Sequence, residues 1–140
     1  MNKLTVSAHL DSLKTIAEYV VKVAKSADLE KKATYKLRLA VDELATNIIN
    51  YAYIYKNAES EKIIELESKV SDHAVIITVI DNGIPFDSTK KLESESETIK
   101  KPIEERGIGG LGIFLAFDGV DDFTYQRLDG HNVNILTVYK

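Results

Sequence analysis

The sequence predicts an α+β fold in which helices pack on one face of a mixed β-sheet. Three observations support this prediction. Apolar residues recur at helical spacing between residues 13 and 54. Runs rich in Val and Ile follow, and two further β-rich runs close the chain after a long polar interval. The resulting order, β-α-α-β-β-long loop-α-β-β, groups the helices instead of alternating them with strands, which is typical of an α+β domain.

The first half of the chain is predicted to hold one short strand and two helices. Apolar and polar residues alternate over residues 4–8, as in a half-buried strand. Helical spacing then extends from Leu13 to Ala24, and a second, longer helix is predicted from about Glu30 to Ile54. The candidate capping residues are Asp11 or Ser12 for the first helix and Asp28 for the second.

The second half is predicted to hold four strands and one helix. The runs "KIIELESKV" and "AVIITVIDNG" are β-rich, and the second is nearly continuous in Val and Ile, as expected of a central strand. The interval between Pro85 and Arg106 has no sustained period, and a connection of that length in a small domain is usually functional or disordered. A helix is predicted over 113–118. Two strands, "DDFTYQRL" and "NVNILTVYK", follow with Asp129-Gly130 as their turn.

Length and composition restrict the class of protein. The 140 residues predict a single domain over 1–140, and a chain of this size needs neither a disulfide nor a metal to fold. It has no cysteine, which excludes disulfides and thiolate zinc sites. The formal net charge is −4, whereas a nucleic-acid-binding protein more often presents a basic face. The N-terminal residues lack a signal-peptide pattern and no run is long enough to span a membrane, so we expect a cytoplasmic protein.

A glycine cluster precedes the predicted short helix. Four of the seven glycines, Gly107, Gly109, Gly110 and Gly112, fall within six positions. They match G-x-G-x-x-G, but no strand precedes them, and Ile113 stands where a P-loop needs lysine. Two interpretations stay open at this point: a flexible hinge, or backbone N–H groups at a helix start that bind phosphate.

Polar residues on the second predicted helix form another candidate site. Glu43 and Asn47 lie one helical turn apart and Asn50 three residues further on, so the three share one face of a regular helix. That face lies beside the apolar stripe and need not be buried. The arrangement is either an ordinary polar flank or a carboxylate base beside an amide oxygen that can bind a hard cation such as Mg²⁺.

The segment "VIDNGIPFD" ends a buried strand with a charge. Asp81 follows a nearly continuous apolar run, and a carboxylate in that position needs a partner. An Asx turn would supply one from the backbone. A ligand amino group would supply one as well, and Gly83 would let that ligand approach the main chain.

These segments, in this order, resemble the GHKL (Bergerat-fold) ATPase superfamily, which includes gyrase and the histidine kinases. Glu43 to Asn47 resembles its N box, "DNGIPFD" its first glycine box and "GIGGLGIF" its second. Single-domain length, together with "GGLGIFLA" and the closing G-x-N element, is similar to the anti-sigma-factor serine kinases. The resemblance covers nearly the whole chain and implies a two-layer Bergerat sandwich with an ATP lid at about 84–112. Pro85 departs from the usual second glycine, as in a variant within this branch, and is expected to stiffen the start of the lid.

The resemblance also implies a role for each site residue. Glu43 would be the general base, and Asn47 would ligate Mg²⁺, with Asn50 beside it as a further cofactor-binding candidate. Asp81 would accept a hydrogen bond from the adenine amino group, and Gly83 would allow close approach. The glycines Gly107, Gly109, Gly110 and Gly112 would close over the phosphates. Asn132 occupies the place where relatives use a small hydroxyl residue near adenine.

The implied function is that of an ATP- and Mg²⁺-dependent serine protein kinase. Its substrate would be an anti-anti-sigma (STAS-domain) protein, and its second partner an RNA polymerase sigma factor that it holds inactive. No nucleic acid or membrane is expected as a direct partner, and a homodimer is a further expectation from this branch. The alternative is a regulatory module that binds ATP or ADP and sequesters a protein partner without transferring phosphate, because both functions need the same pocket.

Overall fold

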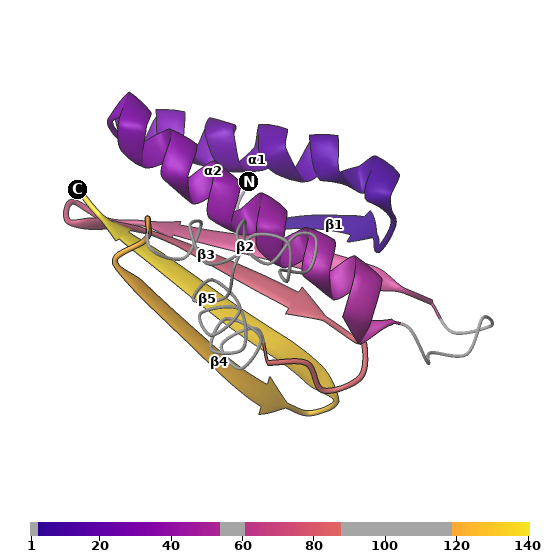
Figure 1. Ribbon diagram of the computed structural model, residues 1–140. Coiled ribbons are helices and arrows are strands. Elements are labelled where there is room, and N and C mark those ends of the chain that lie inside the picture. The colour runs from indigo at the N-terminus through magenta and orange to yellow at the C-terminus, as the bar shows by residue number, and fades with distance from the viewer. Residues whose placement is uncertain (1–2, 54–60, 88–118) are drawn as a thin grey trace, which may run out of the picture.

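The protein is a two-layer sandwich in which two helices cover one face of a five-stranded sheet (Figure 1). The computed structural model describes residues 3–53, 61–87 and 119–140. The predicted helix over 113–118 and the glycine cluster at 107–112 lie outside these residues. Within them, the α+β fold with helices on one face is confirmed.

The elements follow the predicted order. Strand β1 (Lys3–Ser7) leads through a 3-10 turn (Leu10–Ser12) into α1 (Leu13–Ser26), and α2 (Lys31–Asn47) continues as a π-helical turn, η2 (Ile48–Ala52). Then come β2 (Ile63–Val70), β3 (Ala74–Asp81), β4 (Asp122–Leu128) and β5 (His131–Tyr139). The spatial order of the strands is β1-β2-β3-β5-β4, so β3 is central and β1 and β4 form the edges of the described sheet.

All four described strand pairings are antiparallel, which corrects the expectation of a mixed sheet. The reason lies in the connection between β1 and β2. It contains two helices that run side by side in opposite directions (Figure 1), so the chain reverses twice before β2 begins. A single helix in that place would have produced the parallel pairing of a βαβ unit.

The core lies between the helices and the inner face of the sheet. Because strand side chains alternate between faces, every second residue of β5 and of β3 from Val75 onward is buried, as are Ile64 and Leu66 of β2. The largest fully buried side chains include Ile16 and Val20 from α1, Leu37 and Leu44 from α2, and Ile64, Leu66, Ile77 and Leu136 from the sheet. The buried polar residues of the sheet, Asp81, Asn132 and Asn134, gather at one end of this face.

The predicted hairpin turn is confirmed and the predicted cap of α2 is not. The turn at Asp129-Gly130 is confirmed: both residues have positive φ, 50° and 79°, as a tight two-residue hairpin turn requires. The cap prediction for α2 is wrong. Asp28 itself adopts a positive φ of 55°, and Glu30 takes the N-cap position without a side-chain hydrogen bond. Ser12 does hold the N-cap position of α1, although its side chain makes no capping bond.

Candidate functional site

A buried carboxylate forms the centre of the candidate site. Asp81 is the last residue of β3 and only 1% exposed. Its Oδ1 accepts hydrogen bonds from the backbone N–H of Gly83 and from Asn132 Nδ2, both at 2.9 Å. Its Oδ2 is buried and has no hydrogen-bond partner among the described residues. The protein therefore fixes one oxygen of this carboxylate and leaves the other able to accept a hydrogen bond from a ligand.

Asn132 positions Asp81. The register of the sheet places the two residues directly opposite each other on β5 and β3. Besides binding Asp81, Asn132 Nδ2 donates to the carbonyl oxygen of Ile84 at 2.8 Å, while its Oδ1 accepts from the backbone N–H of Phe86 at 3.1 Å and from the Tyr125 hydroxyl at 2.6 Å. The side chain uses two donors and one acceptor on the protein, so we assign it to holding the carboxylate and the segment after β3 in place.

Burial decides the electrostatics of this carboxylate. Desolvation raises the pKa of Asp81, because the charged form loses its water. The hydrogen bonds from Asn132 and Gly83 and the nearby charge of Arg127 oppose that shift without cancelling it. Arg127 is itself fixed, since its Nη1 donates to the carbonyl oxygen of Gly83 at 2.8 Å. The Asx-turn bond predicted from the sequence is thus present, and it leaves half of the carboxylate unpaired.

Gly83 has a packing reason to be glycine. A Cβ atom on Gly83 would lie 2.5 Å from the carbonyl oxygen and 2.8 Å from the Cβ of Ala52, in the π-helical turn η2. The next residue, Ile84, donates its backbone N–H to the same carbonyl oxygen at 2.8 Å. The structure thus shows a close approach at Gly83 to the end of the second helix, whereas the approach that the sequence predicted was that of a ligand. Its role toward a ligand stays a prediction.

A tyrosine that the sequence pattern did not single out joins three segments near Gly83. The hydroxyl of Tyr53 lies 2.6 Å from both the Ile63 carbonyl oxygen and Asn82 Oδ1, and it accepts from the backbone N–H of Asn82 at 3.1 Å. Asn82 Nδ2 donates in turn to the carbonyl oxygen of Glu61 at 2.8 Å. These contacts connect the end of η2 to the start of β2 and the end of β3. Tyr53 is 5% exposed, but tyrosines in "YAYIY" gave no signal to separate this one from its neighbours.

The helix residues of the predicted site are only partly brought together. Glu43 is half-buried on α2, and Asn47, one turn later, is the last α-helical residue and 9% exposed. Asn50 lies in the π-helical turn and is exposed, because the wider turn interrupts the 3.6-residue period that would place it on the same face. Asn47 is buried, although the sequence pattern did not require burial of this helix face. No group of three or more His, Asp and Glu in the described residues would hold a metal by itself.

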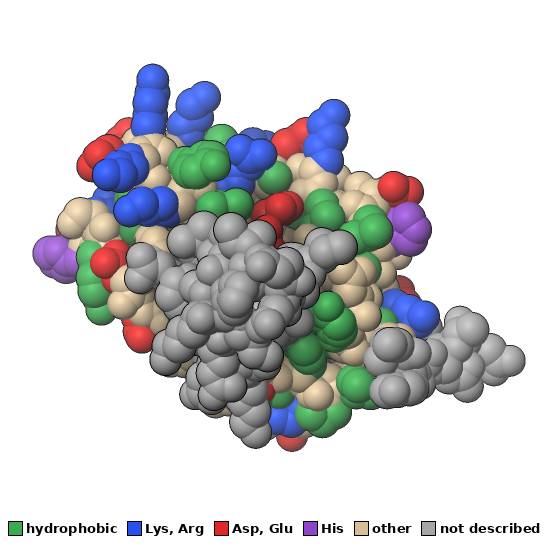
Figure 2. Space-filling model, viewed as in Figure 1, with side chains coloured by type: hydrophobic (Ala, Val, Ile, Leu, Met, Phe, Trp, Pro, Cys, Tyr) green, Lys and Arg blue, Asp and Glu red, His purple; other side chains and the backbone are tan. Residues whose placement is uncertain are grey.

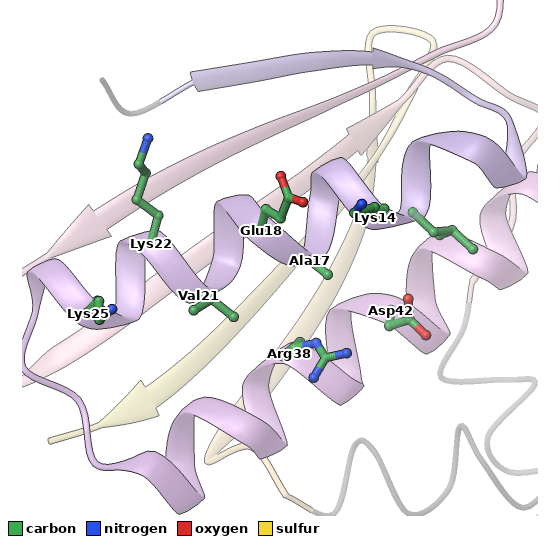
Figure 3. Close-up of a pocket in the computed structure, with 9 residues that line it drawn as sticks. Lys14, Ala17, Glu18, Val21, Lys22, Lys25, Arg38 and Asp42 are labelled. Carbon is green, nitrogen blue, oxygen red and sulfur yellow. The ribbon is translucent and has the colours of Figure 1, made fainter.

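A groove with a volume of about 720 Å³ lies elsewhere in the described structure. It runs between α1 and α2 (Figure 3). Ala17 and Val21 line its apolar part, with Arg38 and Asp42 contributed by α2. Lys and Arg side chains gather over this helical layer (Figure 2). No residue of β3 or β5 lines the groove, so it is separate from Asp81.

The fold agrees with comparisons to known proteins. The profile of the histidine kinase-like ATPase domain family matches residues 6–140. The chain belongs to this family, and the resemblance to the GHKL ATPases is confirmed. Residues 3–53, 61–87 and 119–140, which the structure describes, contain no helix long and apolar enough to cross a membrane.

Particular relatives are named serine-protein kinase RsbW. The protein of that name from Listeria innocua is 30% identical over 118 residues, which cover 84% of this chain and 73% of the relative. The one from Listeria monocytogenes serotype 4b shows the same identity and coverage. The one from Bacillus mycoides is 31% identical over 104 residues, covering 74% of this chain and 62% of the relative.

Proposed function

We propose that this protein is an ATP-dependent serine kinase that acts as an anti-sigma regulatory factor. It would phosphorylate an anti-anti-sigma protein of the STAS class and sequester a sigma factor. The observation that carries the nucleotide part is the open Oδ2 of Asp81, a buried acceptor beside a saturated Oδ1. The serine-kinase part is supported by the relatives named serine-protein kinase RsbW, and the two protein partners come from the resemblance alone.

The geometry of Asp81 favours adenine over guanine. The pairing edge of guanine presents two adjacent N–H donors, which bind a carboxylate through both of its oxygens. Asp81 has one oxygen to offer, because Gly83 and Asn132 already donate to the other. The pairing edge of adenine needs one acceptor, for its amino group, beside a donor for its N1. The pocket is therefore proposed to take ATP and ADP.

We propose the following roles for the chain's residues on the strength of the resemblance to the GHKL family. Asp81 would orient the base, with Asn132 holding the carboxylate and Gly83 letting the chain pass close to η2. Asn47 would ligate Mg²⁺, which when bound neutralises phosphate charge. Glu43, one turn before Asn47, would accept the serine proton while the serine oxygen bonds to the γ-phosphorus and ADP departs. Asn50 and the four glycines stay predicted cofactor-binding residues, the glycines outside the described residues.

The second candidate is a module that binds ATP or ADP and holds a protein partner without phosphotransfer. It shares every contact of the base pocket and differs only in the fate of the γ-phosphate. A cytoplasmic location, a single domain over 1–140, a homodimer and the absence of direct contacts to nucleic acid belong to both versions as predictions.

Glu43→Gln separates the two functions. It keeps size and hydrogen-bonding shape but cannot accept a proton, so transfer from ATP to a purified cognate STAS protein should fall by roughly 10²-fold or more. ATP affinity, measured by calorimetry, should stay within a few-fold of the wild-type value. Asn47→Ala should lose Mg²⁺-dependent binding as well as transfer, because the cation would bridge the protein to the phosphates.

Asp42→Asn is the matched control for Glu43→Gln. Asp42 precedes Glu43 on α2 but lines the groove toward α1, so its neutralisation should leave phosphotransfer unchanged. Equal transfer by Glu43→Gln and wild type would contradict the general-base role. A wild type that binds ATP but transfers nothing to its partner would support the binding module instead.

A further inference from the structure

A second buried polar residue beside Asp81 has no part in the function described so far. Asn134 lies on β5 and is 1% exposed. Neither its Nδ2 nor its Oδ1 has a hydrogen-bond partner among the described residues. It follows Asn132 by two positions and thus faces the same side of the sheet, and it pairs across the strands with Val79. Asp81, two residues after Val79, is its diagonal neighbour on β3.

The distribution of unpaired atoms points to a ligand. In the described parts of the chain, three buried side-chain polar atoms lack a partner: Asp81 Oδ2 and the two amide atoms of Asn134. All three belong to two diagonal neighbours on adjacent strands, whereas the adjacent Asn132 uses both ends of its amide in hydrogen bonds. Burying an amide without partners costs the desolvation of both its ends, so an apolar residue here would be more stable. A group that binds both residues would account for the pattern.

We propose that Asn134 is a second base-reading residue of the nucleotide pocket. Its Nδ2 donates a hydrogen bond to adenine N1, directly or across one ordered water, while Asp81 Oδ2 accepts from the adenine amino group. Together the two side chains offer an acceptor beside a donor, which matches the donor and acceptor on the pairing edge of adenine. Guanine has an acceptor and a donor in the reverse places, so the pair also discriminates against it. The inference rests on the proposed ATP site.

The test combines protein variants that lack a polar side chain with ligands that lack one polar atom. The protein variants are Asn134→Leu, which is close in volume and has no polar atoms, and Thr137→Val, a polar-to-apolar control that lies on the opposite face of β5. The ligands are ADP, 1-deaza-ADP, which has a C–H at position 1, and purine riboside 5′-diphosphate, which lacks the amino group. Dissociation constants are measured by calorimetry for each combination.

The wild type and Thr137→Val should bind ADP about tenfold more tightly than 1-deaza-ADP, the effect of one hydrogen bond. Asn134→Leu should bind ADP about tenfold more weakly than the wild type and should no longer distinguish it from 1-deaza-ADP. Purine riboside diphosphate should bind less tightly than ADP, and the ratio should be the same in all three proteins. The amino group that this ligand lacks is bound by Asp81, which none of the variants changes. An unchanged ADP to 1-deaza-ADP ratio in Asn134→Leu would overturn the proposal.

Two further results keep the interpretation clear. The Tm of Asn134→Leu should equal or exceed that of the wild type, because the variant removes an unpaired amide; if Leu does not fold, Asn134→Val gives the same comparison in a smaller side chain. A wild type that binds no ADP would instead defeat the ATP-site proposal itself. Normal ADP binding with no dependence on Asn134 would leave the ATP site intact and assign the amide to a buried water of purely structural character.

Discussion

Asp81 has one oxygen held by the protein and the other buried without a donor among the described residues, and this division has a cost in stability. Because burial raises its pKa above the unfolded value of 3.8, the native state binds more protons than the unfolded state between these two values. Stability contributed by this group therefore falls as the pH rises through that window. Above that window the folded protein carries an ionised carboxylate that would be more stable in water.

Asp81→Asn should consequently raise the Tm and weaken nucleotide binding at the same time. The amide oxygen can still accept from Gly83 and Asn132, and the charge is gone, so we expect Tm at pH 7 to rise by about 2–6 °C, or roughly 1 kcal/mol. The amide nitrogen then faces the adenine amino group, donor against donor, and both ATP and ADP should bind about 10- to 100-fold more weakly. Calorimetric scans and titrations measure both effects. A lower Tm with unchanged affinity would identify Asp81 as a turn residue only.

The sequence predicted some residues of the proposed base pocket but not all of them. Asp81 stood out because a charge ended an apolar run, and its position alone signalled a partner. Asn134 gave no such signal, since an asparagine in "NVNILTVYK" fits either face of a strand until the register is known. The register, which depends on pairing between distant segments, is what places it beside Asp81.

The junction between the second helix and β3 shows how neighbouring elements support the site. The carboxyl ends of α2 and β3 lie at the same end of the molecule (Figure 1), and η2 contacts the segment after β3 through Ala52 and Gly83. The contact keeps Gly83, which donates to Asp81, at a fixed distance from the helix that carries Asn47. The sequence predicted one helix through Ile54, because neither composition nor spacing marks the change from α to π geometry after Asn47.

Gly83→Ala should disrupt this junction. The added methyl group would lie 2.5 Å from a backbone oxygen, so the segment or the helix end must move, at an expected cost of about 1–3 kcal/mol. Nucleotide affinity should fall as well, since the same backbone N–H positions Asp81.

Gly119→Ala is the matched control. Its Cβ would meet the Lys36 side chain at 3.0–3.2 Å, which is a tight contact. Lys36 takes no part in the hydrogen bonds of Asp81, so nucleotide affinity should not change. Denaturant unfolding and calorimetry of both variants measure the difference. Equal losses of stability and affinity in the two variants would show that the Ala52 contact has no special role.

At the scale of the whole molecule, the central and edge strands of the sheet differ in pairing and burial. Strand β3 is paired on both sides and buried, whereas β1 and β4 are paired on one side in the described structure. The local signals in the sequence, namely strand runs and the Asp129-Gly130 turn, predicted each strand and the closing hairpin correctly. The antiparallel arrangement was not predicted, because it depends on two helices packing together before β2 and not on any single run of residues.

Hydrogen exchange should follow this arrangement. Amides of β3 should exchange more slowly than those of β1 and β4, because opening the centre of the sheet breaks two ladders. Addition of ADP should slow exchange further at Asp81 and at the next three residues, as ligand binding stabilises the state in which their bonds are made. Mass spectrometry on peptides covering 3–7, 74–87 and 122–139 reports both effects. Protection by ADP confined to β1 would place the ligand away from Asp81.

The pairing of Asp81 with Asn132 also sets the order in which the pocket can be assembled during synthesis. The two residues lie 51 positions apart, and their strands are neighbours in the sheet. On a ribosome, β1, β2 and β3 can associate while β5 has not yet been translated, and during that time Asp81 lacks the side chain that orients it. A polypeptide interrupted before the C-terminal hairpin should therefore lack the proposed base pocket, and nucleotide should bind finished molecules but not unfinished ones.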